Sequence, residues 1–289
     1  MSNFLIKGII SGDDFVTETI LTGLALNENL SEYWIVAQNE NRCNELRHKY
    51  NINAMTNFDL VDKADILILT FKYEDTKEML SKIAGRISKN TLIISIIPGI
   101  ALKFVSNFFT DNEVIRLTLN PSIISGQGLA AYIANANATD KSKKVVHDML
   151  AGFSKIIEVS NEDEFEKVRR FIFANTFLSY VLVKSLIDAG TKVGFSTEQA
   201  GLIVDQILKG ASKTLIDFQN AGNEMLKDGL RNKKFTNHAI ELIREYGIYD
   251  SLERYLTMKE TTSLFEADNY SVENNINLNY NWFERMVRD

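Results

Sequence analysis

The chain has 289 residues, of which 45% are apolar and 24% are charged, and its net charge is −6 at pH 7. This length suggests two domains, and the composition is typical of a globular protein rather than a disordered one. Because acidic groups outnumber basic ones, the sequence offers no basic face for nucleic acid or anionic lipid. We therefore expect neither nucleic acid nor a membrane as a partner.

The sequence also lacks the features of membrane, secreted and metal-binding proteins. The longest apolar stretch, residues 91–101, is too short to span a bilayer, and the N-terminus lacks a basic region followed by a cleavable apolar segment. We therefore expect a cytoplasmic protein. Cys43 is the only cysteine, so an intrachain disulfide and a thiolate metal site are both impossible. No cluster of His, Cys, Asp or Glu has metal-ligand spacing, and we expect no metal.

The first 160 residues alternate strands with helices. An apolar run ends at Gly12 and an amphipathic helix begins by about Val16, the strand, turn and helix that open a Rossmann domain. Further strands are expected at residues 33–37, 64–71, 91–97, 113–119, 129–134 and 155–159, with helices at 40–50, 74–87, 102–109 and 141–152. This alternation predicts an α/β fold with a parallel, doubly wound, Rossmann-like sheet over residues 1–160.

The period of the sequence changes after residue 160. Apolar residues keep helical spacing over residues 162–190, and Gly194 interrupts the pattern. A capping box at residues 196–199 opens a second long helix that extends to about residue 220. We expect an all-helical domain over residues 161–289.

The turn after the first strand departs from the G-x-G-x-x-G fingerprint of dinucleotide-binding domains. Its three positions read Gly12, Asp14 and Thr17. The second glycine normally lets the backbone approach a pyrophosphate at the positive end of the helix, so a carboxylate there opposes phosphate binding. Asp14 is either the N-cap of the helix beside an empty or altered site, or a reader of a cationic group. We expect dinucleotide binding that is weak or lost.

Short motifs in a fixed order carry a resemblance to a known family. They are residues 20–24 (ILTGL), 64–72 (ADILILTFK), 93–100 (IISIIPGI), 116–128 (RLTLNPSIISGQG), 179–194 (SYVLVKSLIDAGTKVG), 210–211 (GA) and 240–241 (IE). Over about residues 3–267 the chain resembles the pyrroline-5-carboxylate reductases, which reduce a cyclic imine to proline with NADPH or NADH in proline biosynthesis. The resemblance implies a Rossmann domain, a helical domain over residues 161–289 that mediates dimerisation and binds the substrate, and a homodimer or larger assembly.

The chain departs from that family where ligands bind. Residues 174–180 read ANTFLSY where the family has S-G-S-G-P-A-Y, so bulky side chains replace small ones that make room for a nicotinamide. Residues 230–236 read LRNKKFT in place of a V-T-S-P-G-G-T-T loop that holds the substrate's nitrogen and carboxylate, and only Thr236 survives. Together with the altered turn, three ligand-binding motifs are degenerate. We therefore expect a diverged member of the family.

The resemblance and the pattern together give the candidates for the cofactor site, which are Gly12, Asp14, Arg42, Lys72 and Asn120. Arg42 either meets a ribose 2′-phosphate or lies on a helix surface, and the missing acidic residue at the end of the second strand favours NADP over NAD. Lys72 either lines the cofactor cleft or is solvated. Asn120 either holds the nicotinamide half or only stabilises the turn into Pro121.

Two hypotheses about function remain. In the first, the chain is a reductase that passes a hydride from NADP or NAD to a C=N or C=O carbon, with Asn120, Thr176 and Thr236 positioning the reactants. In the second, it is a catalytically inactive homodimeric paralogue that serves as a binding or regulatory protein, because one fold hosts many functions.

The substrate-site candidates are Arg231, Lys233, Lys234 and His238. The three basic residues form a short loop that either binds a small anionic metabolite or is only solvated. His238 is a candidate general acid that protonates the forming amine.

Overall fold

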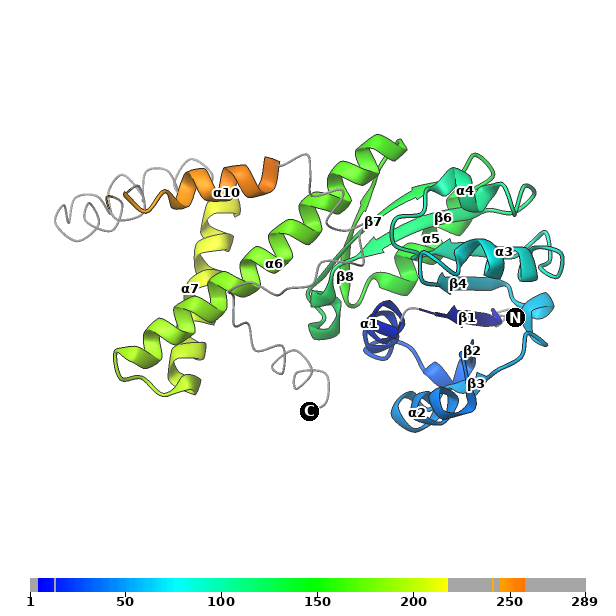
Figure 1. The fold of residues 1–289 in the computed structure, drawn as a ribbon, viewed down its shortest axis with the longest axis horizontal. Helices are drawn as coiled ribbons and strands as arrows, with labels where there is room; N and C mark the ends of the chain where they lie inside the picture. The colour runs from blue at the N-terminus through cyan, green and yellow to red at the C-terminus, as the bar shows by residue number, and fades with distance from the viewer. Residues whose placement is uncertain (1–4, 13, 218–240, 242–244, 258–289) are drawn as a thin grey trace. The chain divides into compact units, whose positions relative to one another are not determined.

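The computed structural model describes residues 5–12, 14–217, 241 and 245–257. By its contacts the chain divides into two compact units, Met1–Met258 and Lys259–Asp289, and the second lies outside the described residues. The first unit contains an eight-stranded sheet in the order β3-β2-β1-β4-β5-β6-β7-β8 (Figure 1). The strands are β1 (Lys7–Ser11), β2 (Tyr33–Val36), β3 (Asn53–Met55), β4 (Ile66–Thr70), β5 (Leu92–Ser95), β6 (Val114–Leu119), β7 (Gly128–Ala134) and β8 (Ser154–Glu158).

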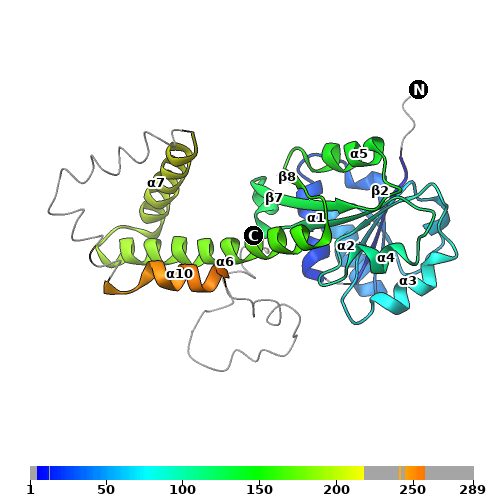
Figure 2. The same cartoon turned by 90° about the horizontal axis from the view of Figure 1, so that it is seen from above.

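Helices cover both faces of the sheet, and each face has its own apolar core (Figure 2). One core joins α1 (Asp14–Leu24), α2 (Glu40–Tyr50) and α5 (Asp140–Leu150) to strand residues such as Ile9. The other joins α3 (Thr76–Ala84), α4 (Leu102–Ser106) and the start of α6 (Glu162–Lys192) to the alternate residues, such as Ile10. Because both faces are buried, the strands read as continuous apolar runs, as in doubly wound folds.

The elements predicted for the first 160 residues are confirmed, and α2 begins and ends at the predicted residues. The sequence pattern does not predict β3, whose three residues carry no strand pattern. The predicted parallel, doubly wound sheet is confirmed except at one pair, since β7 is antiparallel to β6 while β8 is parallel to β7. The reason is the short connection between β6 and β7, a 3₁₀ turn (Pro121–Ser125) followed by Gly126 at φ +72°, which leaves no room for a crossover helix.

From residue 162 onward the described residues form helices joined by short turns, as predicted. It contains α6, α7 (Thr197–Asp217) and α10 (Ile248–Thr257). Gly194 lies between α6 and α7 at φ +104°, a conformation that favours glycine. The predicted capping box is confirmed, because Ser196 Oγ accepts from the N–H of Gln199 at 3.1 Å and the Gln199 side chain accepts from the N–H of Ser196 at 3.0 Å. The domain boundary at residues 160 and 161 stays a prediction.

A buried arginine ties the first turns of α6 to the sheet. Arg116, on β6, is 3% exposed and forms ion pairs with Glu162 and, at 2.7 Å, with Glu166. Its guanidinium also lies 4.4 Å from the ring centroid of Phe165. The side chain of Asn161 caps the helix by accepting from the backbone N–H of Glu164. These contacts fix where α6 leaves the sheet.

Beyond its first turns α6 carries a row of exposed apolar side chains, which is continued on α7. The members on α6 are Phe171, Phe177, Val181, Leu182 and Leu186, and those on α7 include Leu202, Ile203 and Ile207. By length and composition alone α6 also qualifies as a membrane span, and only 17% of its most apolar window is buried. Exposed apolar surface of this extent is typical of an interaction site.

Candidate functional site

The turn after β1 keeps the first glycine of the fingerprint for a steric reason. A Cβ atom on Gly12 would lie 3.0 Å from the Cα of Phe71 and 3.3 Å from the N of Lys72, both in the segment after β4. Gln38, after β2, donates from Nε2 to the Gly12 carbonyl at 2.9 Å. The ends of three neighbouring strands therefore meet closely at this turn, which is where such sheets bind dinucleotides.

Thr17, at the third position of the fingerprint, is fully buried and shares a 2.8 Å hydrogen bond with the hydroxyl of Thr70 on β4. In the fingerprint a glycine here permits close packing of the helix on the sheet. In this chain a pair of hydroxyl groups achieves that contact instead. The replacement of glycine by threonine therefore leaves the packing of α1 intact.

The contacts of Asp14 match neither the plain N-cap nor the reader of a cationic ligand that the sequence offered as interpretations. It is the first residue of α1, and its carboxylate lies 3.2 Å from Nε of Arg42, so the cationic group that it meets belongs to its own chain. Arg42 also donates to Glu18 at 2.8 Å and to Glu45 at 2.9 Å. The side chain of Arg42 is 16% exposed, so three carboxylates hold it between α1 and α2.

The ionisation of this cluster follows from those contacts. Burial raises the pKa of Glu18, but hydrogen bonds from Lys49, Tyr50 and Arg42 outweigh it, so the pKa lies below its ordinary value. Burial lowers the pKa of Arg42, and hydrogen bonds to Glu45 and Glu18 more than offset this, so its pKa is raised. Glu18 and Arg42 are therefore both charged at neutral pH, and Arg42 also pairs with Asp14.

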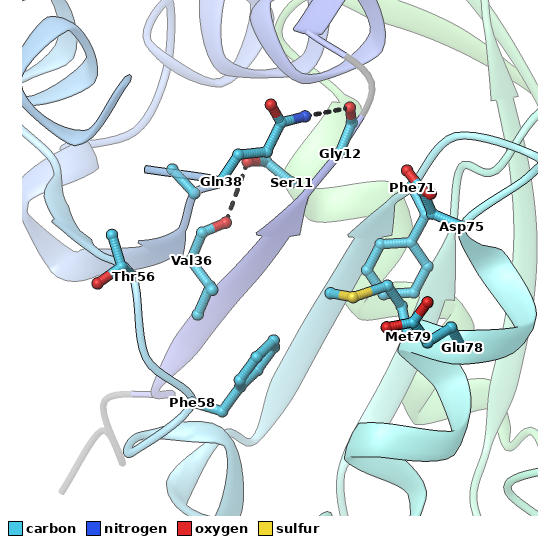
Figure 3. A pocket seen from close by; sticks show the side chains of 11 residues that line it. Ser11, Gly12, Val36, Gln38, Thr56, Phe58, Phe71, Asp75, Glu78 and Met79 are labelled. Atoms are coloured by element: carbon cyan, nitrogen blue, oxygen red, sulfur yellow. Dashed lines mark hydrogen bonds between the residues drawn. The ribbon is translucent and has the colours of Figure 1, made fainter. Parts of the chain in front are cut away.

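A cavity of about 300 Å³ lies beside this turn, between the ends of β1, β2 and β4 and the start of α3 (Figure 3). Aromatic and aliphatic side chains form much of its wall, and two carboxylates lie on the α3 side. The lining residues are Ser11, Gly12, Val36, Ala37, Gln38, Thr56, Phe58, Phe71, Asp75, Glu78 and Met79. The size and place of this cavity fit the adenosine half of a dinucleotide.

Two predicted catalytic residues meet in a second place. Asn120, which follows β6, donates from Nδ2 to the hydroxyl of Thr176 on α6 at 3.1 Å. Its Oδ1 accepts from the backbone N–H of Leu129 at 2.8 Å, and Thr176 donates to the carbonyl of Ile172 at 2.8 Å. Both side chains are buried, at 8% and 7% exposure. Within the described residues one amide hydrogen of Asn120 remains for a ligand.

A cavity of about 230 Å³ adjoins this pair, between the turn after β6 and α6. The hydroxyls of Ser122 and Tyr180 lie 3.2 Å apart at its edge. Its lining residues are Asn120, Ser122, Leu129, Phe171, Ile172, Asn175, Thr176, Ser179 and Tyr180, none of which is charged. The described wall therefore offers amide and hydroxyl groups for hydrogen bonds but no charged side chain.

Of the remaining predicted site residues, Lys72 alone lies among the described residues. Lys72 is exposed just after β4, where its carbonyl accepts from Thr76 Oγ1 at 2.8 Å, and it lines neither of these two cavities. The other candidates, Arg231, Lys233, Lys234, Thr236 and His238, lie outside the described residues. Gln38, Asp75 and Glu78 are not among the residues predicted from the sequence. Gln38 follows β2 closely, whereas Asp75 precedes α3 and Glu78 lies in its first turn; the available signal was that ligands bind near the ends of these strands.

Comparisons with known proteins agree with this geometry. Residues 8–99 match a family model described as NADP oxidoreductase, coenzyme F420-dependent. The chain is 25% identical to a pyrroline-5-carboxylate reductase of Staphylococcus aureus (strain COL) over 253 residues, which are 86% of this chain and 93% of that protein.

Two solved structures share the fold over nearly the whole chain. A pyrroline-5-carboxylate reductase of Streptococcus pyogenes superposes with a TM-score of 0.76 at 20% identity, covering 91% of this chain and 99% of that one. The Plasmodium falciparum pyrroline carboxylate reductase with NADP bound gives a TM-score of 0.77 at 18% identity, covering 92% and 97%. Over nearly its whole length the chain is therefore similar to pyrroline-5-carboxylate reductases, at low sequence identity, and it shares their fold.

Proposed function

We propose that the chain is an NAD(P)H-dependent reductase of a C=N or C=O group in a small substrate. The observation that carries this proposal is the hydrogen-bonded pair of Asn120 and Thr176 beside an uncharged cavity. The pair follows β6 and therefore lies at the same edge of the parallel strands as the turn after β1. A dinucleotide bound along that edge would extend from the first cavity toward the second.

The residues around the second cavity suit positioning rather than proton transfer. A bound nicotinamide supplies the hydride that the substrate carbon accepts, and the nitrogen or oxygen of the double bond takes a proton. Asn120 has an amide hydrogen with which to hold a carboxamide or a substrate oxygen, and Thr176 fixes the orientation of that amide. Thr236 and His238 remain our proposed partners for the substrate, with His238 as the proton donor.

We further propose that the substrate differs from pyrroline-5-carboxylate. Support comes from the bulky residues at 174–180 and from residues 230–236, where only Thr236 of the family's substrate loop survives. An anionic group on the substrate would then pair with Arg231, Lys233 and Lys234. A role in proline biosynthesis would require turnover of the parent substrate.

The test follows nicotinamide absorbance with pyrroline-5-carboxylate and with a series of cyclic imines and small ketones. We expect turnover of pyrroline-5-carboxylate well below about one per second, a rate typical of ordinary enzymes, and faster turnover of another member of the series. Thr176→Val should lower that faster turnover at least about ten-fold, whereas the exposed control Thr110→Val should not. Rapid turnover of pyrroline-5-carboxylate would return the chain to the parent reaction.

A specific observation also favours the alternative, a binding or regulatory protein without catalysis. Asp14 brings a carboxylate to the turn where phosphate binds in related folds. Absence of turnover across the series, together with tight binding of a metabolite, would establish this second function.

We propose that the exposed apolar row on α6 and α7 is covered by a second copy of the chain, in a cytoplasmic homodimer or larger assembly. The row runs through Phe177, Val181 and Leu182, and by helical spacing the ion pair of Lys184 with Asp188 lies on the same face as Phe177 and Val181, so this face is not uniformly apolar. Light scattering should give at least twice the monomer mass without detergent. A monomer mass, or a requirement for detergent, would refute this.

A further inference from the structure

The cavity beside the β1 turn has walls of two kinds (Figure 3). Phe58 and Met79 present apolar surface, which suits the faces of a flat heterocycle. Ser11 is turned away from a ligand, since its hydroxyl donates to the carbonyl of Val36 at 3.0 Å. The charged groups of the lining are Asp75 and Glu78, and both are acidic.

The acidic side of the cavity has free hydrogen-bond acceptors. Asp75 precedes α3, yet its side chain makes no capping hydrogen bond, so its carboxylate is available to a ligand. Glu78 pairs with Lys82 one turn further along α3, at 2.5 Å, and its side chain is 71% exposed. Lys82 is not among the lining residues, so the described wall presents acceptors for hydroxyl and amino groups and no cation for a phosphate.

Arg42 is the basic residue nearest in sequence to the end of β2, where a 2′-phosphate would need a partner. It lies on the α1 side, where Asp14, Glu18 and Glu45 surround its guanidinium, and it does not line the cavity. A 2′-phosphate carries a charge of about −1.5 to −2 at pH 7. To pair with Arg42, that phosphate would have to displace the carboxylates that already pair with the Arg42 guanidinium.

We propose that this cavity takes the adenosine half of a dinucleotide whose ribose carries free hydroxyl groups, and that it rejects a 2′-phosphate. The ligand class is therefore NADH rather than NADPH. Arg42 is a positioning residue that neutralises Asp14 and Glu18 at the phosphate turn, and it does not read the ribose. This inference rests on the proposed function, because it assigns the cofactor class of the same site.

The first experiment titrates the full chain with NADH and with NADPH and follows nicotinamide fluorescence. We expect NADH to bind at least about ten-fold more tightly. Arg42→Ala should weaken both dinucleotides by the same factor, because it leaves the carboxylates of Asp14 and Glu18 uncompensated. Equal or tighter binding of NADPH overturns the inference, and so does an Arg42→Ala effect that is confined to NADPH.

The second experiment tests the acidic wall. Asp75→Asn combined with Glu78→Gln should reduce the preference for NADH at least about three-fold, since the repulsion of the 2′-phosphate is removed. Asp148→Asn is a matched control that removes one negative charge from the exposed surface of α5 and should leave the preference unchanged. Thermal unfolding of each variant shows whether it is folded. A preference that survives in the folded double variant overturns the role of these carboxylates.

The third experiment separates this inference from the reductase proposal. Calorimetry compares 5′-AMP with adenosine 2′,5′-bisphosphate, which differ only in the 2′-phosphate and need no nicotinamide chemistry. Tighter binding of 5′-AMP supports the inference even when no substrate is reduced, in which case the reductase proposal alone fails. Preference for the bisphosphate, or no binding of either nucleotide at millimolar concentration, overturns the inference.

Discussion

Replacing Arg116 with alanine should destabilise the chain by about 2–3 kcal/mol. Removal of one partner from a buried ion pair usually costs about 3–5 kcal/mol, because the other charge is left without compensation. The cost is smaller here because the Glu162 side chain is 37% exposed and Glu166 keeps its bond to Arg169 at 2.7 Å. The lost contact with Phe165 adds about 1 kcal/mol.

The assay is equilibrium unfolding in urea, followed by circular dichroism, on the wild type and on Arg116→Ala. The midpoint should fall while the slope with denaturant stays the same, which identifies a change in stability. Lys144→Ala is the control, since its pair with Asp148 is exposed on both sides and should be worth less than about 1 kcal/mol. A loss at Arg116 no larger than that of the control would refute the reasoning.

The pH dependence gives an independent check on the same contact. Burial raises the pKa of Glu166, but bonds and charges from Arg169 and Arg116 outweigh it, so the pKa lies below its ordinary value. A carboxyl with a depressed folded-state pKa stabilises the fold above its unfolded pKa of about 4.3, and this contribution is lost as the pH falls through the folded value. Arg116→Ala should therefore lose less stability than the wild type between about pH 5 and the folded pKa.

Three further changes test the two candidate sites. Asp14→Gly should tighten NADH binding about three- to ten-fold, because it removes a carboxylate from the phosphate turn; weaker binding would show that Asp14 has another role. Thr17→Gly should instead cost about 1–2 kcal/mol of stability in thermal unfolding through its lost bond to Thr70, and an unchanged midpoint would contradict this. Gly12→Ala should weaken dinucleotide binding in the fluorescence titration, since its Cβ would lie 3.0 Å from the Cα of Phe71; unchanged affinity would show that the turn can move without loss.

Local signals in the sequence were sufficient to predict those features of the structure that depend on residues close together in the sequence. The limits of α2 follow from a cap at Asn39, whose side chain accepts from Arg42, and from Asn51 at φ 51°. The capping box of α7 is equally local. The direction of β7 was not predicted, because the pattern of apolar residues in a buried strand is the same for parallel and antiparallel pairing.

The candidate site was predicted in part, for a related reason. Asn120 and Thr176 were both expected at the site from the family resemblance, and the fold brings them to hydrogen-bonding distance. The pairing of Asp14 with Arg42 was not foreseen, since these residues meet only after β1 and β2 have paired and placed α1 beside α2. The acidic wall formed by Asp75 and Glu78 likewise depends on how α3 is set against the sheet.

The contacts of α6 have a mechanical consequence. Arg116 holds the helix at Glu162 and Glu166, and Asn120 holds it again at Thr176, about 15 Å further along its axis. Two attachment points fix the direction of a rigid rod, whereas one leaves it free to pivot. About 24 Å of helix extends beyond the second point. A small tilt of α6 beside Asn120 is therefore magnified into a larger displacement at the far end of the helix. Occupancy of the second cavity and the position of the exposed apolar row are thus linked through the tilt of α6.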